Sequence, residues 1–435
     1  MRKLILICLL LLTATATADN LKTVLDSALR NDPVLSAARF NFKAAVQATP
    51  QARALLLPNI ALDASRTNTT QTGSTAFKTD TDDIALTITQ PVFNYALFMK
   101  LRQAKTTVKK AGVDLNVAYQ DLLIRVTERY FAVLTAIDKL AFARSEKRAI
   151  TRQLEQARKR FDVGLIAITN VHEARAAFDL ATAEVISARN DLASRQEALR
   201  EITNRPHLVL HHLKSSIPLV SPNPSNLQEW VRIALKQNLK LKAISYDAAI
   251  ARTEIKVQQS EHLPTVDIVA SKTKNNSTGG FFGALDTDNE SVRLRLKIPL
   301  FRGGFTSSKN KQARHQYSQA KENLEKQRRQ TLRETRDAYR GVIAGISRVR
   351  ALKQAIVSTQ SALKATRAGY RVGTRTIVDV LNSQRELFKA LSNYSEARHG
   401  YVINLLKLKQ AAGTLSVKDL GTINNWLVPA PTPGG

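Results

Sequence analysis

Few residues in this 435-residue chain have types and spacing suited to chemistry. The segment HLVLHH puts His207, His211 and His212 at a spacing suited to a metal ion, but no carboxylate flanks it. Gly303 and Gly304 stand between an expected strand and an expected helix, as in a phosphate-binding loop. The Gly-Lys-Ser/Thr ending of such loops is missing, so the pair more simply lets the chain turn. We find no nucleophile–base set and no carboxylate pair, and we predict no enzyme, no cofactor and no metal site.

The first 18 residues have the pattern of a secretory signal peptide. A basic pair precedes a short apolar run, and Ala16-Thr17-Ala18 matches the small-residue cleavage site, so the mature chain is expected to start near Asp19. The single cysteine, Cys8, lies in this segment, which leaves the mature chain without a thiol. No other apolar run approaches the roughly 20 residues of a membrane-spanning helix.

The net charge of +29 suggests an anionic partner. Two features speak against nucleic acid as that partner. The expected export signal takes the chain out of the cytoplasm, and the basic residues are spread over helices without interleaved aromatic residues. We therefore predict no nucleic-acid binding.

The sequence contains an internal duplication. The segment that starts at Leu21 aligns with the one at Leu227, LPNI at Leu57 aligns with LPTV at Leu263, and RFDVGLIAITNV matches GYRVGTRTIVDV. The expected organisation is therefore two similar repeats with a linker and a tail. These parts are a first repeat over 19–206, a linker over 207–226, a second repeat over 227–412 and a C-terminal tail over 413–435.

Each repeat is expected to contain a hairpin of very long helices, over 94–204 and 305–412. About 65 residues of helix extend about 100 Å, which no globular core spans. Apolar residues recur every seven positions on both sides of each turn, which predicts coiled-coil packing with the turns at 161–170 and 370–379. These residues are Val133, Leu140, Leu154, Phe161, Val171, Phe178, Val185, Leu192 and Leu199 in the first repeat, and Val342, Val349, Ile356, Leu363, Tyr370, Val380, Leu387, Tyr394 and Tyr401 in the second.

Four segments alternate between apolar and polar residues over the length of a transmembrane strand: about 57–67, 81–93, 263–273 and 290–301. The polar segments between the members of each pair are expected to be outer loops. Four strands cannot enclose a lumen, and an open sheet leaves unpaired edges that hydrocarbon does not tolerate. Three chains would give a 12-stranded β-barrel continued by an α-helical barrel. A water-soluble hairpin domain with one wet face stays open as an alternative.

The last strand carries three basic residues that alternate with apolar ones. If Val292, Leu294 and Leu296 face lipid, then Arg293, Arg295 and Lys297 face the lumen. A basic residue on the lipid face costs about 2–4 kcal/mol near the bilayer midplane, which favours this register. A basic lumen is therefore expected.

Signal peptide, duplication, strand pairs, heptad helices and paired Val-Gly turns together resemble the TolC family of outer-membrane channels. The likeness is closest in GYRVGTRTIVDVL, FDVGLIAITNV and HLPTVD. It implies a homotrimer in the outer membrane of a Gram-negative bacterium, extending into the periplasm. It also implies docking to a periplasmic adaptor (membrane fusion) protein and to an inner-membrane transporter of the ABC or proton-driven type. Such a protein is a passive conduit for drugs or proteins in efflux or type I secretion.

The resemblance also implies a gate at the periplasmic helix tips. Tyr370 and Arg375 would link the inner coil to the neighbouring one, and Thr169 and Asn170 would receive these links. Asp379 would form a carboxylate ring. The family's second acidic ring falls at Asn382, and the acidic partner of Arg375 falls at Asn170, so a weaker latch is expected here. The expected adaptor contacts are Val163, Gly164, Leu165, Val372, Gly373 and Thr374.

A simpler interpretation of the same residues is structural. Asn170 and Asp379 are expected to begin helices as N-caps, with Glu173 completing a capping box at Asn170, and Gly164 and Gly373 are turn residues. The second hypothesis for the whole chain is a soluble periplasmic coiled-coil adaptor or scaffold.

Overall fold

The computed structural model describes residues 19–74, 76–207, 209–280 and 283–429; the expected signal peptide lies outside them. The chain divides into two compact units. Unit 1 contains the described residues of Met1–Ser36, Ala118–Asn238 and Thr331–Gly435, and unit 2 contains those of Ala37–Val117 and Leu239–Gln330.

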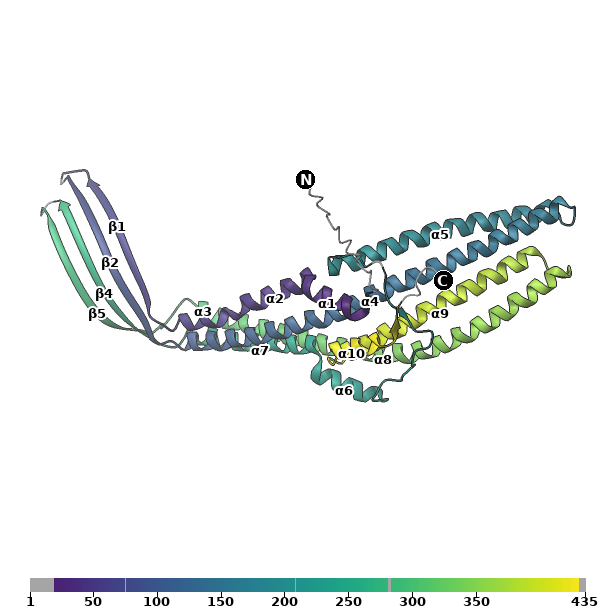
Figure 1. Cartoon of the computed structure of the whole chain (residues 1–435). Helices are drawn as coiled ribbons and strands as arrows, with labels where there is room; N and C mark the ends of the chain where they lie inside the picture. Colours follow the sequence, from purple (N-terminus) through teal and green to yellow (C-terminus); the bar gives the residue numbers. More distant parts are fainter. Residues whose placement is uncertain (1–18, 75, 208, 281–282, 430–435) are drawn as a thin grey trace, which may run out of the picture. The chain divides into compact units, whose positions relative to one another are not determined.

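The predicted fold class is confirmed: the chain is mainly helical, with two pairs of long helices and four long strands (Figure 1). The helices are α1 (Leu21–Asn31), α2 (Pro33–Val46), α3 (Ala48–Ala54), α4 (Tyr95–Asp162), α5 (Ile168–Thr203), α6 (Leu227–Gln237), α7 (Leu239–Ser260), α8 (Phe305–Arg371), α9 (Ile377–Ala411) and α10 (Val417–Asn424). The strands are β1 (Asn59–Gln71), β2 (Phe77–Phe93), β3 (His212–Leu213), β4 (Thr265–Gly279), β5 (Leu285–Lys297) and β6 (Leu427–Val428). None of the described helices has an apolar stretch that could cross a membrane.

Unit 2 contains a four-stranded antiparallel sheet in the order β1-β2-β4-β5, so β1 and β5 are its edges. A row of opposed residues crosses it from Asn59 through Thr89 and Val269 to Arg293. Successive residues of a strand point to opposite faces, so this row and every second row beside it share one face.

The two faces of the sheet differ in chemistry. One face carries an apolar band, and the other carries mostly Thr, Ser and Asn with a few charges. The apolar band consists of Ile60, Leu62, Ala64, Ile84, Leu86, Ile88, Val266, Ile268, Ala270, Val292, Leu294 and Leu296. A sheet of this kind separates an apolar medium from a polar one.

The strands extend further than the sequence analysis expected. The segments expected to be long outer loops are largely strand, because β1 continues to Gln71 and β4 to Gly279. Polar side chains bond across the ladders there, as in Asn68 Nδ2 to Asp80 Oδ1 (2.5 Å). The expected last strand, 290–301, instead ends at Lys297, since Pro299 follows and Gly303 and Gly304 adopt positive φ. The sequence analysis expected loops there because the segments are polar, and it gave too little weight to the preference of threonine for strands.

Unit 1 contains α5, α9 and the later parts of α4 and α8, from Ala118 and Thr331 on, and the turns α4–α5 and α8–α9 lie at the same end of the unit (Figure 1). The expected seam residues Val342, Val349 and Leu363 are buried, and Leu140 packs with Ala143 and Ala188 between α4 and α5. The placement of Phe161 in the seam was wrong. Its side chain is 39% exposed, because α4 ends one residue later.

The linker and the tail are part of the packed structure of unit 1. Strands β3 and β6 pair, α10 buries Leu420 and Ile423, and the Tyr401 hydroxyl accepts a hydrogen bond from the Val220 amide (2.8 Å). The described residues of the segments 207–226 and 413–435 therefore pack against the helices of unit 1 and contribute to its core.

Candidate functional site

The two hairpin turns have the same local geometry, which explains the repeated motif. Gly164 and Gly373 adopt φ of 75° and 81°, a region that favours glycine. The next amide of each turn donates back to the last helical turn, from Leu165 to the Arg160 carbonyl (2.8 Å) and from Thr374 to the Gly369 carbonyl (2.9 Å). Each Val-Gly pair thus ends one long helix with a left-handed cap.

The residues expected to contact an adaptor are exposed at these turns. Val163, Leu165 and Val372 are 68%, 73% and 75% exposed, and Gly164, Gly373 and Thr374 are exposed beside them. Apolar side chains this exposed at the ends of both hairpins form a plausible contact surface for a partner.

The helix starts after the turns differ from the expectation. Thr376 is the N-cap of α9, and Asp379 is the third helical residue, whose carboxylate accepts from the Thr376 amide (2.9 Å) and hydroxyl (3.0 Å). The N-cap of α5 is Ala167, with no side-chain cap bond, so the interpretation of Asn170 as a cap with Glu173 was wrong. Asp379 was expected to be the N-cap, but Thr376 takes that position and Asp379 completes a Thr-x-x-Asp capping box with it.

The capping box lowers the pKa of Asp379. Hydrogen bonds from Thr376 and, to a smaller degree, the charge of Arg375 lower the pKa of this exposed carboxyl. Asn382 lies three residues further along α9 and is also exposed, so the two share one side of the helix.

Tyr370 contacts the first hairpin. The Arg160 guanidinium lies 5.1 Å from the centre of the Tyr370 ring, a cation–π distance. The ring also packs against a buried cluster formed by α4, α5 and α9. This cluster consists of Ile150, Leu154, Ala157, Ala174, Ala177, Ala181, Ile377 and Leu381, with Ile166, Val171 and Phe178 beside it.

Arg375 does not reach the residues expected to receive it. Among the described residues of the chain, no hydrogen bond or ion pair joins Arg375 to Thr169 or Asn170. Its side chain instead lies over Gly369, where an added Cβ would come within 2.8 Å of Arg375 Cγ. Near the tips of one copy, Arg160 of the first hairpin and Tyr370 of the second form a cation–π contact, which the sequence analysis did not anticipate.

An open groove of about 870 Å³ lies between α4 and the α8–α9 hairpin near the tips. Arg152, Lys364, Arg367 and Arg371 line it together with glutamines and apolar residues, and no acidic residue lines it. Arg367 also donates to the side-chain oxygen Oε1 of the buried Gln384 (3.1 Å), which ties α8 to α9. The groove is therefore suited to an acidic surface.

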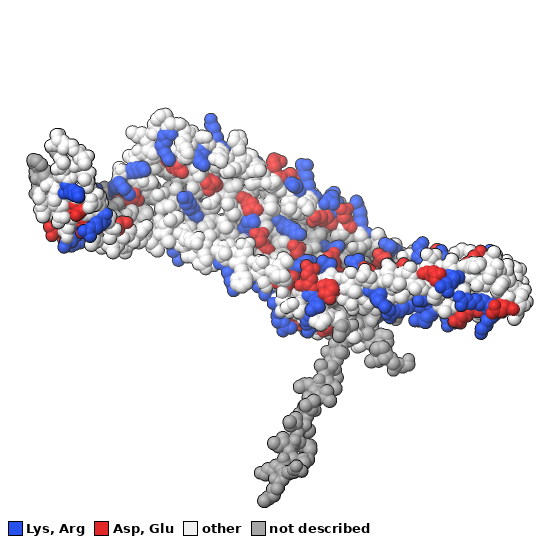
Figure 2. Space-filling model, turned by 90° about the horizontal axis from the view of Figure 1, so that it is seen from above, with Lys and Arg blue, Asp and Glu red and all other residues white. Residues whose placement is uncertain are grey.

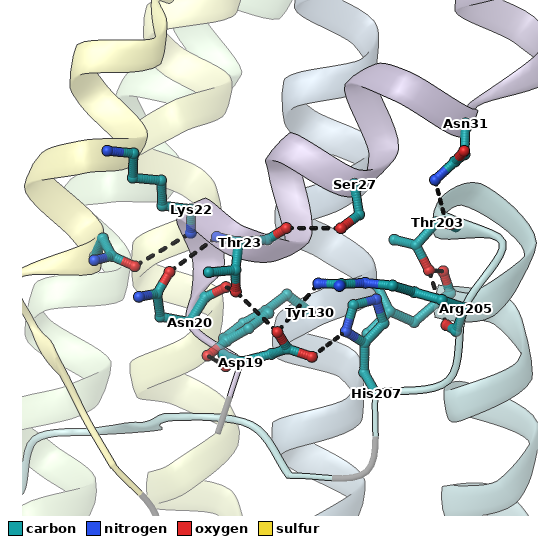
Figure 3. Close-up of polar contacts among 12 residues, drawn as sticks. Asp19, Asn20, Lys22, Thr23, Ser27, Asn31, Tyr130, Thr203, Arg205 and His207 are labelled. Atoms are coloured by element: carbon teal, nitrogen blue, oxygen red, sulfur yellow. Dashed lines mark hydrogen bonds and ion pairs between the residues drawn. The ribbon is translucent and has the colours of Figure 1, made fainter. Parts of the chain in front are cut away.

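A polar cluster fixes the first described residues of unit 1, from Asp19 on (Figure 3). Asp19 accepts from Arg205 (3.1 Å) and Thr23 (3.1 Å), and its other carboxylate oxygen is 2.7 Å from His207 Nδ1. The Asp19 amide donates to the Val209 carbonyl (2.8 Å). His207 thus has an anchoring contact, and no group of three or more His, Cys, Asp or Glu among the described residues could hold a metal.

A second buried cluster surrounds His399 of α9. Its Nδ1 is 2.8 Å from the Thr135 hydroxyl, which itself donates to the Phe131 carbonyl, so Nδ1 carries the hydrogen. Burial, with the charges of Arg398 and His212, lowers the pKa of His399 to about 3. Burial raises the pKa of the nearby Asp138, which accepts from Ser395.

This environment predicts acid sensitivity of unit 1. An unfolded histidine ionises near pH 6.5, so between pH 6.5 and about 3 the unfolded chain binds a proton that folded His399 does not, and stability falls as pH falls. Asp138 opposes this effect in part, because it gains its proton first in the folded state. We expect His399→Gln to reduce the loss between pH 7 and 4 by about 2 kcal/mol. Thermal midpoints against pH measure it.

The exposed His315 of α8 supplies the control. His315→Gln should leave the pH profile unchanged. Parallel profiles for His399→Gln and the unsubstituted protein would contradict the prediction.

Basic side chains are spread along the helices with acidic ones among them, on the face seen in Figure 2. They do not gather into one patch there. The absence of nucleic-acid binding stays a prediction.

Comparisons with known proteins match the chain over nearly its full length. A model of the outer membrane efflux protein family matches it twice, over residues 24–205 and 230–414, in agreement with the internal duplication. The chain is 36% identical to the outer membrane protein TolC of Vibrio cholerae, over 96% of this chain and 95% of that protein. It is 30% identical to the alkaline protease secretion protein AprF of Pseudomonas aeruginosa, over 98% and 91%.

The fold has a solved counterpart in the outer membrane protein VceC of Vibrio cholerae. The TM-score is 0.75, with 20% sequence identity over 90% of this chain and 96% of that chain. At this identity the likeness concerns the fold alone.

Proposed function

The chain belongs to the outer membrane efflux protein family, and we propose that three copies of it form the exit duct of a tripartite export system. It is an outer-membrane channel of the TolC family, and it is not an enzyme. The observation that best supports a shared barrel is the sheet of unit 2, which has one apolar face, one polar face and two unpaired edges. Unpaired strand edges are not stable in hydrocarbon, so further copies must cover them.

We propose that the hairpin tips form the gate of this duct. Asp379 would supply one ring of three carboxylates, with Asn382 as a neutral ring beside it. The Arg160–Tyr370 contact would hold the two hairpins of one copy together, and Arg375 remains available to a neighbouring copy. Thr169 and Asn170 would receive Arg375 across that boundary.

The partners follow from the exposed tips and the basic groove. A periplasmic adaptor would contact the tip residues Val163, Gly164, Leu165, Val372, Gly373 and Thr374. A helical hairpin with an acidic face would fit the groove lined by Arg152, Lys364, Arg367 and Arg371. An inner-membrane transporter would supply the energy. The relative AprF is a protease secretion protein, which supports proteins as one cargo beside drugs.

The alternative, a soluble adaptor or scaffold, fits less well. A soluble protein gains nothing from an apolar band on the open face of a sheet, where side chains such as Leu294 (73% exposed) would meet water. Fractionation and planar-bilayer recording distinguish the two. We expect the protein in the outer membrane, with discrete conductance steps; a soluble protein without conductance would exclude the duct.

Bilayer recording also tests the expected basic lumen. Arg293, Arg295 and Lys297 share the polar face of the sheet with Asp63, Asp83 and Asp267, and Arg295 pairs with Asp267 at 3.3 Å. We expect the triple substitution to glutamine to move the reversal potential in a salt gradient towards cation preference. The same substitution at Lys272 and Lys274, on the opposite face, serves as the control. An unchanged reversal potential would reject a role of the three residues in selectivity.

A single substitution tests the receiving side of the gate. We expect Asn170→Asp to lower the resting conductance a few-fold, because a carboxylate would bind Arg375 about twice as strongly as an amide does. Asn190→Asp, at an exposed position of α5 outside the gate, adds the same charge and should leave the resting conductance unchanged. Equal or higher resting conductance of Asn170→Asp would count against the link.

A further inference from the structure

We infer that β5 of one copy pairs with β1 of the next in one definite antiparallel register, which sets Asp63 of one copy opposite Arg293 of its neighbour. In this register Asn59 lies opposite Lys297, and Gln71 lies opposite Leu285. The inference rests on the proposed trimer and names the residues that would close it.

The two edges are matched in length and direction. β1 (Asn59–Gln71) and β5 (Leu285–Lys297) each have 13 residues. All three ladders of the sheet are antiparallel, so its first and last strands run in opposite directions. Joining β5 to the next β1 therefore continues the antiparallel pattern. In the proposed register the two strands overlap from end to end, and neither leaves an unpaired stretch.

The apolar bands of the two edges coincide in this register. Ile60, Leu62 and Ala64 of one copy lie opposite Leu296, Leu294 and Val292 of the other. All six lie on the apolar face of the sheet. The band would then run across the junction without a polar gap, as the lipid-facing side of a barrel requires.

Two pairs of opposite charge also meet. On the polar face Asp63 faces Arg293, whose direct partner in β4 is the uncharged Val269. On the other face Arg66 faces Glu290. Arg66 already contacts Asp82 (3.4 Å), and Glu290 contacts Lys272 (2.6 Å). The junction would join these contacts into one alternating row of four charges. Opposite charges directly across a strand pair stabilise it.

A register displaced by two residues keeps one pair of opposite charges, Asp63 with Arg295 or Arg66 with Asp288, and loses other matches. Displacement in one direction places Arg66 opposite Val292 and Asn59 opposite Pro299, which has no amide hydrogen to donate. Displacement in the other direction places Ala64 opposite Glu290. Displacement by one residue would put apolar residues on the polar face.

The tilt of the strands supports the same register. The row that begins at Asn59 reaches Arg293 in the same copy and would arrive at Asp63 of the next, four residues further along β1. For twelve strands this shift corresponds to a tilt of about 35°, within the usual range for barrels. A shift smaller by two residues gives about 19°, well outside that range, and a shift larger by two residues gives about 46°, just above it.

Cysteine cross-linking in a Cys8→Ser background tests the register. Ser65 and Ser291 lie opposite each other in it, both on the polar face, and Ser→Cys changes little in size. The two residues stand at opposite edges of one sheet with two strands between them, more than about 14 Å apart, so a disulfide can form only between copies. We expect the double variant Ser65→Cys/Ser291→Cys to give covalent trimers on a non-reducing denaturing gel.

Two displaced pairs are the matched controls: Thr67→Cys/Ser291→Cys and Thr67→Cys/Thr287→Cys. Both should remain largely monomeric on the gel, as should each single variant. Preferential cross-linking of a displaced pair, or none at Ser65/Ser291, would overturn the register. The native mass of the reduced protein in detergent separates the two levels: a trimer without the expected cross-link rejects only the register, and a monomer rejects the proposed trimer itself.

Discussion

Tyr370→Leu is expected to raise the resting conductance of the closed duct by about tenfold. The substitution removes a ring that lies 5.1 Å from the Arg160 guanidinium and packs on the buried cluster between the hairpins. A cation–π contact contributes about 0.5–2 kcal/mol, and 1.4 kcal/mol corresponds to a factor of ten in an equilibrium. If the contact holds the tips closed, its loss shifts the gate towards the open state. Planar-bilayer recording without partners measures this shift.

Tyr370→Phe separates the ring from the hydroxyl. It retains the cation–π contact and the packing, so its resting conductance should stay close to that of the unsubstituted protein. Arg160→Met should resemble Tyr370→Leu, and the double variant should add little to either, because both remove the same contact. A Tyr370→Phe channel as leaky as Tyr370→Leu would show that the hydroxyl is the essential group and that Arg160 is not its partner.

The sequence predicted the elements with strong periodicity and missed contacts between distant residues. The heptads predicted the hairpin seams because a seven-residue spacing allows one kind of packing, and the alternating runs predicted which face of β5 carries Arg293. The ends of β1 and β4 were missed because their outer residues are polar, so no apolar alternation marks them. In a barrel, strands continue beyond the lipid region where cross-strand hydrogen bonds suffice.

The tip contacts show a different limit. The capping box of Thr376 and Asp379 is local, and the Thr-x-x-Asp pattern could have identified it. The sequence analysis instead assigned Asp379 as the N-cap. Arg160 and Tyr370 lie in different repeats, as do the members of the Asp138–His399 cluster, and no local pattern indicates that they meet. Asp19 and His207 are likewise joined only by the fold.

The charges at the junction of copies predict that one substitution weakens the trimer and that a second, compensating substitution restores it. We expect Asp63→Arg to weaken the trimer strongly, because the new cation would stand opposite Arg293 and diagonal to Arg295, three times in the barrel. Like charges directly opposite on paired strands are destabilising. The trimer should dissociate in mild detergent at a clearly lower temperature than the unsubstituted protein does, as measured by native mass against temperature.

The exchange of charges identifies the cause. Asp63→Arg combined with Arg293→Asp restores opposite charges in the inferred register and should recover most of the lost thermal stability. Thr67→Arg places the same cation on the same face of β1 but opposite the uncharged Asn289, so it should have a small effect. Recovery by Arg295→Asp rather than by Arg293→Asp would indicate a junction displaced by two residues. No recovery by either would mean that Asp63 meets neither arginine across the boundary.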